Sequence, residues 1–254
     1  MQDPDPDSRP AATRRSVRPF PKCERMAVGL LWMALTASRA LASQSLPVTT
    51  PSELLASDPR RIAQVLDDAR PTPVSEEVKV RTLRSLPREG EVTDLSGAVR
   101  QRLMALGPLL RATRRDGVYV VKVIDVPQAT VAIHARVVVL ISRPALDMLD
   151  AEELQALVAH EVGHEYVWAD YERASTGSDH ARLRELELLC DGIAVVLMHG
   201  LGIDPARLIA GLEKLRRFNQ RQFGRAIKNV DDYPTESRRR EFVRAAEIWV
   251  ARPK

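Results

Sequence analysis

The sequence predicts an α+β fold, in which a mostly helical domain carries a small β-sheet packed against one of its helices. Valine and isoleucine gather in only two neighbouring runs, residues 118–126 and 129–142, which indicates few strands. Before and after these runs, capping residues, prolines and glycines divide the chain into stretches with helical signals. With 254 residues, 44% of them hydrophobic, the chain can bury the core of one domain.

Residues 1–42 have the composition of an export signal. Proline and charged residues fill the first part, which we expect to be disordered. The apolar run "AVGLLWMALTA" follows, and the small residues Ala40 and Ala42 allow cleavage before Ser43. This run is shorter than the roughly 20 residues that cross a bilayer, so we predict a signal peptide. A buried core helix is the alternative, but the adjacent basic leader favours export to the periplasm or the extracellular space.

Charge and cysteine content narrow the classes of partner. The net charge of +4 comes largely from the leader, because residues 43–254 hold 31 Lys/Arg and 30 Asp/Glu. We therefore predict no nucleic-acid partner, since nucleic acid binds to a clustered basic face. Only Cys190 remains after processing, so we expect it to be buried rather than paired in an intrachain disulfide. The pair Arg14 and Arg15 leaves both the general and the twin-arginine export routes open.

Residues 43–93 are predicted to form an N-terminal helical segment and a linker. Residues 51–70 have the pattern of two short helices that Pro59 separates. Residues 71–93 are rich in proline and are expected to form a loose connection.

Residues 94–254 are predicted to form the main domain. A helix is expected from Leu95 to Arg114, bent or broken at Gly107 and Pro108. The two β-rich runs follow, and the turn-forming "DVPQ" separates them.

Helical signals dominate the rest of the chain. Asp150 and Glu153 have the spacing of a capping box, which begins a helix that we expect to extend to about Trp168. Three further helices are predicted: from Ser178 or Asp179 to Gly200, from Asp204 with Pro205 in its first position, and from Thr235.

The segment "HEVGH" has the spacing of a zinc site. His160 and His164 lie four residues apart on one predicted helix, so both imidazoles point from the same face and can reach one metal ion. Glu161 is rotated by about 100° from His160. It would therefore border the metal without binding it, where it can accept a proton from a metal-bound water. We predict one Zn²⁺ per chain.

Two carboxylates are candidates for the third ligand. Asp170 stands six residues after His164, but it could bind only if the helix broke sharply at Val167, where no residue favours positive φ. Glu187 lies in a leucine-rich stretch, where a charge needs a partner. Asp191 follows it by one turn, so one carboxylate can bind zinc while the other orients a ligand histidine. This arrangement favours Glu187 and leaves Asp170 as the alternative.

"HEVGH" followed by "ELELLCDGIA" resembles the gluzincin metallopeptidases, and more narrowly their HtpX-like and CAAX-prenyl-protease-like branch. The resemblance covers about half of the chain, from Val118 to Arg240. It implies a zincin-type domain with its small sheet packed on the active-site helix. It also implies the following roles: zinc ligands His160, His164 and Glu187, catalytic acid/base Glu161, and Asp191 behind a ligand histidine.

The segment "YPTESRRR" resembles the histidine-proline element of this family, which glutamate and arginine follow. Tyr233 stands where the family usually has histidine. A phenol can also donate a hydrogen bond to an oxyanion, so Tyr233 is a candidate for that role. Arg238 matches the arginine of the family and could tie this loop to the site. Unlike the integral-membrane members, the mature region has no apolar run long enough to span a bilayer.

The resemblance implies a zinc-dependent endopeptidase that hydrolyses peptide bonds of exported or envelope proteins. We expect the peptide or protein substrate to lie as an extra strand along a sheet edge such as residues 135–142. The alternative is a zinc-stabilised binding or chaperone-like envelope module with little hydrolysis. Glu161 favours the enzyme, because a structural metal site needs no general base. Substrate identity, cleavage preference and oligomeric state are not specified by the sequence.

Overall fold

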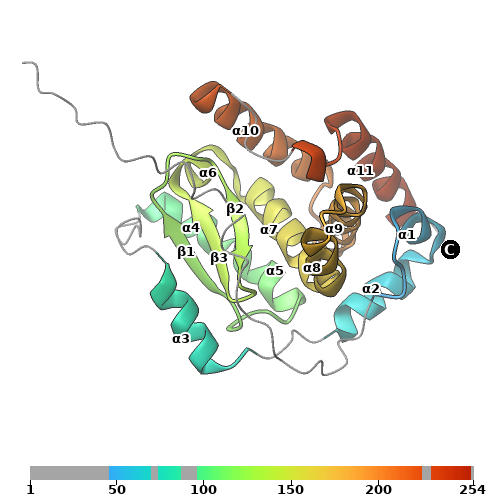
Figure 1. The fold of residues 1–254 in the computed structure, drawn as a ribbon, viewed down its shortest axis with the longest axis horizontal. Coiled ribbons are helices and arrows are strands. Elements are labelled where there is room, and N and C mark those ends of the chain that lie inside the picture. Colours follow the sequence, from blue (N-terminus) through green and yellow to red (C-terminus); the bar gives the residue numbers. More distant parts are fainter. Residues whose placement is uncertain (1–45, 70–73, 87–95, 225–229, 253–254) are drawn as a thin grey trace, which may run out of the picture. The chain divides into compact units, whose positions relative to one another are not determined.

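A computed structural model of the chain describes residues 46–69, 74–86, 96–224 and 230–252. The predicted leader and signal peptide, with the cleavage position before Ser43, lie outside these ranges. The described residues belong to one compact unit, Leu35–Lys254. As predicted, the described fold is α+β, mostly helical with one small mixed sheet (Figure 1).

The elements follow one another along the chain as α1 (Pro51–Ala56), α2 (Pro59–Asp68), α3 (Glu76–Ser85), α4 (Gly97–Met104), α5 (Leu106–Ala112), β1 (Val120–Ile124), β2 (Val131–His134), β3 (Val138–Ser142), α6 (Arg143–Met148), α7 (Ala151–Tyr166), α8 (Trp168–Thr176), α9 (His180–Gly200), α10 (Ala206–Phe223), the 3₁₀ helix η3 (Val230–Asp232) and α11 (Glu236–Val250).

The sheet has the strand order β1–β3–β2, with β3 parallel to β1 and antiparallel to β2. The predicted run 129–142 is therefore two strands rather than one. The chain turns at Ala135 and Arg136, whose φ angles are 49° and 58°, and Val137 N–H closes the turn on His134 C=O. Such backbone usually needs asparagine or glycine, and neither is present, so the sequence carries no turn signal here.

The expectation that residues 135–142 form an open edge is wrong, because β3 has a neighbour on each side. The edge that contacts α7 belongs to β2. Ser142 N–H donates to Thr130 C=O, so Thr130 faces β3. Because facing alternates along an antiparallel pair, the peptide groups of Val131 and Ile133 point away from β3 and toward the α7 side.

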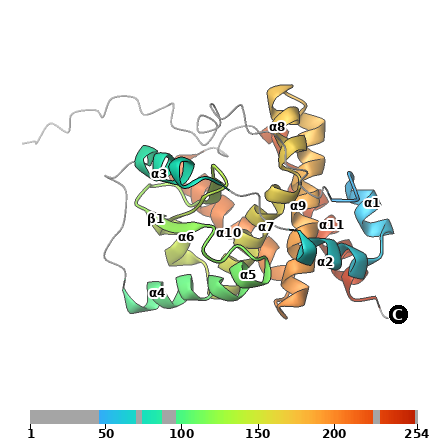
Figure 2. The same ribbon diagram turned by 90° about the horizontal axis from the view of Figure 1, so that it is seen from below.

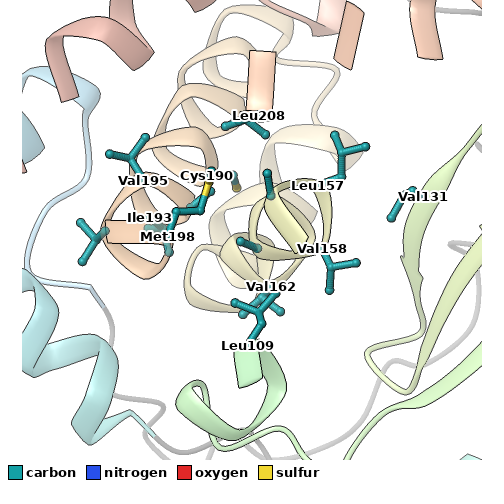
Figure 3. Close-up of a cluster of buried hydrophobic side chains, with 14 of the residues drawn as sticks. Leu109, Val131, Leu157, Val158, Val162, Cys190, Ile193, Val195, Met198 and Leu208 are labelled. Carbon is teal, nitrogen blue, oxygen red and sulfur yellow. The ribbon is translucent and has the colours of Figure 1, made fainter. Parts of the chain in front are cut away.

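The pair of helices α7 and α9 occupies the centre of the core. α7 contacts β2 and α10 as well as α9, and α9 also contacts α1, α2, α8 and α11. In Figure 1, α7 stands between β2 and α9. Figure 3 shows the buried side chains at this centre, which are Leu157, Val158 and Val162 of α7 and Cys190, Ile193, Val195 and Met198 of α9. The predicted burial of Cys190 is confirmed.

The N-terminal helices share this core. Pro59 separates α1 from α2, as predicted. Leu54 and Ile62 are buried in the same hydrophobic cluster as α9, and the indole N–H of Trp249 in α11 donates to Ser57 C=O at 2.8 Å. The helices α1 and α2 therefore pack onto the main domain. Among the described residues, no helix combines the length and apolar character that a membrane crossing requires.

Two predictions for the chain before the sheet need correction. Residues 76–85 form α3 instead of a loose connection, and the hydroxyl of Ser75 caps it by accepting a hydrogen bond from Val78 N–H. The predicted helix from Leu95 to Arg114 is broken, but at Ala105. The ring of Pro108 clashes with a helical carbonyl four residues earlier, so α4 ends at Met104.

The helix boundaries around α7 decide where the site residues lie. Asp150 and Glu153 form the predicted capping box. The helix ends at Tyr166 rather than at Trp168, because Val167 leaves helical geometry at φ −117° and ψ 12°, and α8 starts directly after it. The helices α9 and α11 begin after Asp179 and Thr235 as predicted, whereas α10 begins at Ala206, one residue later than expected.

The turn between β2 and β3 provides a test of backbone strain. Ala135→Gly is expected to raise the free energy of unfolding by about 1 kcal/mol. Glycine avoids the cost of about 1–2 kcal/mol that left-handed backbone imposes on an L-residue, but it loses more conformational entropy on folding, which offsets part of the gain. Ala132→Gly in β2 is the matched control and should lower it by about 0.5–1 kcal/mol. Urea unfolding followed by circular dichroism measures both. A destabilised Ala135→Gly chain would contradict strain at this turn.

Candidate metal centre

His160 and His164 lie on one face of α7. Their rings are 5.1 Å apart and perpendicular to each other. Within the described part of the chain, one nitrogen of each and a carboxylate oxygen of Glu161 lie within 4.8 Å of one another, a grouping that could hold a metal ion. The predicted pairing of the two imidazoles on one helix face is therefore present.

The carboxylate of Glu187 reaches the same point from α9. Its Oε2 lies 3.4 Å from Nε2 of His160, and its Oε1 lies 3.7 Å from Nε2 of His164. Ligand atoms about 2.1 Å from a tetrahedral zinc ion lie about 3.4 Å apart, so the spacing fits such an ion. Glu161 and Glu187 are thus both close enough to the histidines to complete a site.

Asp191 lies behind His160, as the sequence predicts for an orienting carboxylate. Its Oδ1 is 2.8 Å from His160 Nδ1, an ion-pair distance, and neither buried atom meets the geometry of a hydrogen bond with any described residue. A proton on Nδ1 would leave the lone pair of Nε2 facing the Glu187 carboxylate. Two lone pairs 3.4 Å apart repel each other unless a proton or a cation lies between them. The nitrogen of His160 and the oxygen of Glu187 are therefore arranged as two ligands of one metal ion would be.

The close approach of α7 and α9 brings these groups together. A Cβ atom on Gly163 would lie 3.0 Å from both the Cα and the carbonyl oxygen of Cys190. Glu187 and Asp191 flank Cys190 on α9, just as His160 and His164 flank Gly163 on α7. The glycine therefore sets the distance between the two pairs of side chains.

Arg239 of α11 belongs to this cluster and was not predicted. Its Nη2 donates to Oε2 of Glu187 at 2.9 Å, and its Nε donates to Oδ2 of Asp191 at 2.6 Å. Arg238, the residue suggested by the family resemblance, is exposed instead. The periodicity of α11 could have identified Arg239, because it precedes the buried Phe242 and Val243 at helical spacing.

The electrostatic environment separates the roles of the histidines and glutamates. Burial lowers the pKa of His160, but bonding to Asp191 and Glu187 outweighs it and raises the value to about 10. Burial lowers the pKa of His164 to about 4. The carboxylates that attract a proton to His160 would equally attract a metal cation. Burial opposes ionisation of Glu187, yet His160, His164 and Arg239 hold its pKa well below the usual value.

Glu161 differs from Glu187 in its surroundings. Burial raises the pKa of Glu161 to about 7, and the charge of Glu187 adds to this effect. Its Oε2 accepts a hydrogen bond of 3.1 Å from Ile133 N–H on the outer edge of β2. A carboxyl group that titrates near neutral pH is suited to accept and release protons.

Two tyrosines interact with the metal-binding groups, Tyr233 through charge and Tyr171 through direct contacts. Tyr233 precedes α11 and is 46% exposed, and the charge of Glu187 together with burial raises the pKa of its phenol. The hydroxyl of Tyr171 in α8 lies 3.4 Å from Oε1 of Glu187, and its ring stands edge-on to His164. Nothing in the local sequence marks Tyr171, because its position depends on the break at Val167.

Asp170, the alternative third ligand, has other partners. It forms ion pairs with Arg173 on its own helix and with Arg182 of α9, the latter at 3.1 Å. The structure thus gathers His160, Glu161, His164, Glu187 and Asp191 in one cluster.

No model of a known protein family matches the chain, and a search of curated proteins also finds no match. The resemblance to gluzincins accordingly stays a prediction from the motifs.

The crossing of α7 and α9 can be tested at Gly163. Gly163→Ala is expected to lower the free energy of unfolding by about 1–3 kcal/mol, because the new methyl group meets the backbone of α9. Metal affinity should fall as well, since the two helices must separate. Gly200→Ala is the control, because a Cβ there meets no atom within 4 Å. Urea unfolding and competition with a chromophoric chelator measure the effects. Equal metal affinity in both variants would contradict this role of Gly163.

Proposed function

We propose that the chain is a zinc-dependent endopeptidase of the gluzincin type, related to the HtpX-like and CAAX-prenyl-protease-like branch. It would bind one Zn²⁺ and hydrolyse exported or envelope proteins in the periplasm or outside the cell. One observation carries the proposal. The Nε2 atoms of His160 and His164 both face the carboxylate of Glu187, while Glu161, with its raised pKa, borders the same point.

His160, His164 and Glu187 would hold the zinc, and Asp191 would fix His160 with its proton on Nδ1. Bound zinc would supply a Lewis acid that polarises a peptide carbonyl and makes a water molecule more acidic. Glu161 would take the proton of the attacking water and pass it to the leaving amine. A pKa of about 7 supports both halves of this transfer.

Tyr233 is the proposed donor to the oxyanion. Its phenol is partly exposed, and its raised pKa keeps the hydroxyl protonated. A hydroxyl group can stabilise the negative charge that develops on the carbonyl oxygen.

The outer edge of β2 is the proposed binding surface for the substrate. The peptide groups of Val131 and Ile133 point away from β3. Ile133 N–H already donates to Glu161, so an extended peptide would pair, as an additional strand, with the N–H and C=O of Val131 and the C=O of Ile133. Asn219 of α10 fixes the start of this edge, because its side chain both donates to and accepts from the backbone of Ala129 at 2.8 Å. Main-chain pairing depends little on the substrate sequence, which suits an endopeptidase.

The ligand assignment predicts an order of metal affinities. His160→Ala, His164→Ala and Glu187→Ala should each lose most of the bound zinc, because each removes a ligand. Asp191→Ala should weaken binding about ten- to a hundredfold, since it removes an orienting contact. Asp170→Ala should leave affinity nearly unchanged. Zinc per chain and chelator competition give the values. If Asp170→Ala emptied the site while Glu187→Ala did not, a longer-motif zincin would replace the gluzincin assignment.

The catalytic assignment predicts that Glu161→Gln keeps zinc but cleaves peptides about 10²- to 10⁴-fold more slowly, because the general base is lost. Glu152→Gln, an exposed position on the same helix, is the control and should cleave normally. New termini in a diverse peptide mixture, with and without chelator, report cleavage. A wild-type chain that binds zinc and a protein partner but generates no new termini would support the binding or chaperone-like module instead.

A further inference from the structure

Tyr171 connects the two helices that carry the proposed zinc ligands. Its ring centroid is 4.9 Å from that of His164 on α7, and its hydroxyl lies 3.4 Å from Oε1 of Glu187 on α9. One half-buried side chain of α8 makes both contacts. We infer that Tyr171 is a positioning residue, which holds His164 and Glu187 at the separation that a metal ion requires. The inference rests on the proposed function, because it concerns the ligands of the proposed zinc.

The break at Val167 makes this arrangement possible. In an uninterrupted helix, Tyr171 would stand seven residues, or about 10 Å along the axis, beyond His164. The helix is instead interrupted at Val167, and the two ring centroids are 4.9 Å apart. After the break, α8 runs beside α9 (Figure 2). The partly exposed ion pair between Asp170 and Arg182 also joins the start of α8 to α9, but such a pair contributes little to stability.

A neutral hydrogen-bond donor suits this position. Oε2 of Glu187 already accepts a charged hydrogen bond from Arg239. A second cation on Oε1 would compete with a metal ion, whereas a phenol orients the oxygen without adding charge. A tyrosine hydroxyl carries its proton at neutral pH, so Tyr171 can donate to Oε1 of Glu187.

The two contacts can be separated by substitution. Tyr171→Phe retains the ring beside His164 and removes only the hydroxyl. Metal affinity should fall about tenfold, at the lower end of the range for lost orienting contacts, because 3.4 Å is long for a hydroxyl bond. The visible spectrum of the Co²⁺-loaded chain should also change, because Glu187 loses a fixed orientation. Tyr171→Leu removes both contacts and should lose about a hundredfold.

Tyr166→Phe is the matched control. Tyr166 is also a half-buried phenol, but its hydroxyl bonds Leu66 C=O and Arg115, outside the metal-binding cluster. This variant should lose stability without losing metal affinity. Competition with a chromophoric chelator and absorption of the Co²⁺-loaded full chain give both readouts, and circular dichroism verifies folding.

Equal affinities and equal Co²⁺ spectra in Tyr171→Phe and Tyr166→Phe would overturn the inference, while metal binding by the wild type would leave the proposed function standing. A wild-type chain without metal affinity would reject both together. If Tyr171→Leu fails to fold, the comparison between the two phenylalanine variants still decides the outcome.

Discussion

The close approach of α7 and α9 at Gly163 is the constraint on which the site depends. The two imidazoles and the two carboxylates come from these two helices alone, so a single interhelical distance sets four side chains relative to one another. Gly163 lies against the backbone of Cys190, where any side chain would push the helices apart. Apolar residues surround the crossing, and an interior packed at crystal-like density resists small shifts. The core and the metal-binding geometry are therefore one structural feature.

The second constraint is buried charge. Glu187 and Asp191 are almost fully buried, and removing two carboxylates from water costs several kcal/mol each unless cations and hydrogen bonds compensate. Arg239 supplies one cation to both carboxylates, and it comes from a third helix, α11. The position of α11 is fixed in turn by Trp249, which bonds the backbone after α1 at Ser57. The N-terminal helices thus support the charge balance of the site, although none of their residues belongs to it.

The features that the sequence predicts correctly are those with local causes. The Asp150 capping box, the helical spacing of the histidines and the pairing of Glu187 with Asp191 can all be derived from neighbouring residues. Features that depend on distant contacts are missed. Arg136 adopts positive φ in the β2–β3 turn while its guanidinium binds both oxygens of Glu165 at 3.0 and 3.1 Å, a compensation that no local pattern reveals. Strand order depends on contacts of the same kind, so the sequence indicates the wrong strand as the edge.

The end of α7 at Val167 is not predicted by the local sequence, and its effect on the site differs from the one that the longer zincin motif implies. Asp170 is the less favoured ligand in the sequence because nothing at Val167 favours positive φ, yet the helix does end there, with φ at −117°. A break therefore needs no glycine, and it does not by itself carry Asp170 to the histidines. Asp170 instead pairs with Arg182 of α9, and the same change of direction turns Tyr171 toward His164. Adjacent residues of a helix point about 100° apart. Asp170 can therefore pair with Arg182 of α9 while its neighbour Tyr171 contacts His164 in the metal-binding cluster.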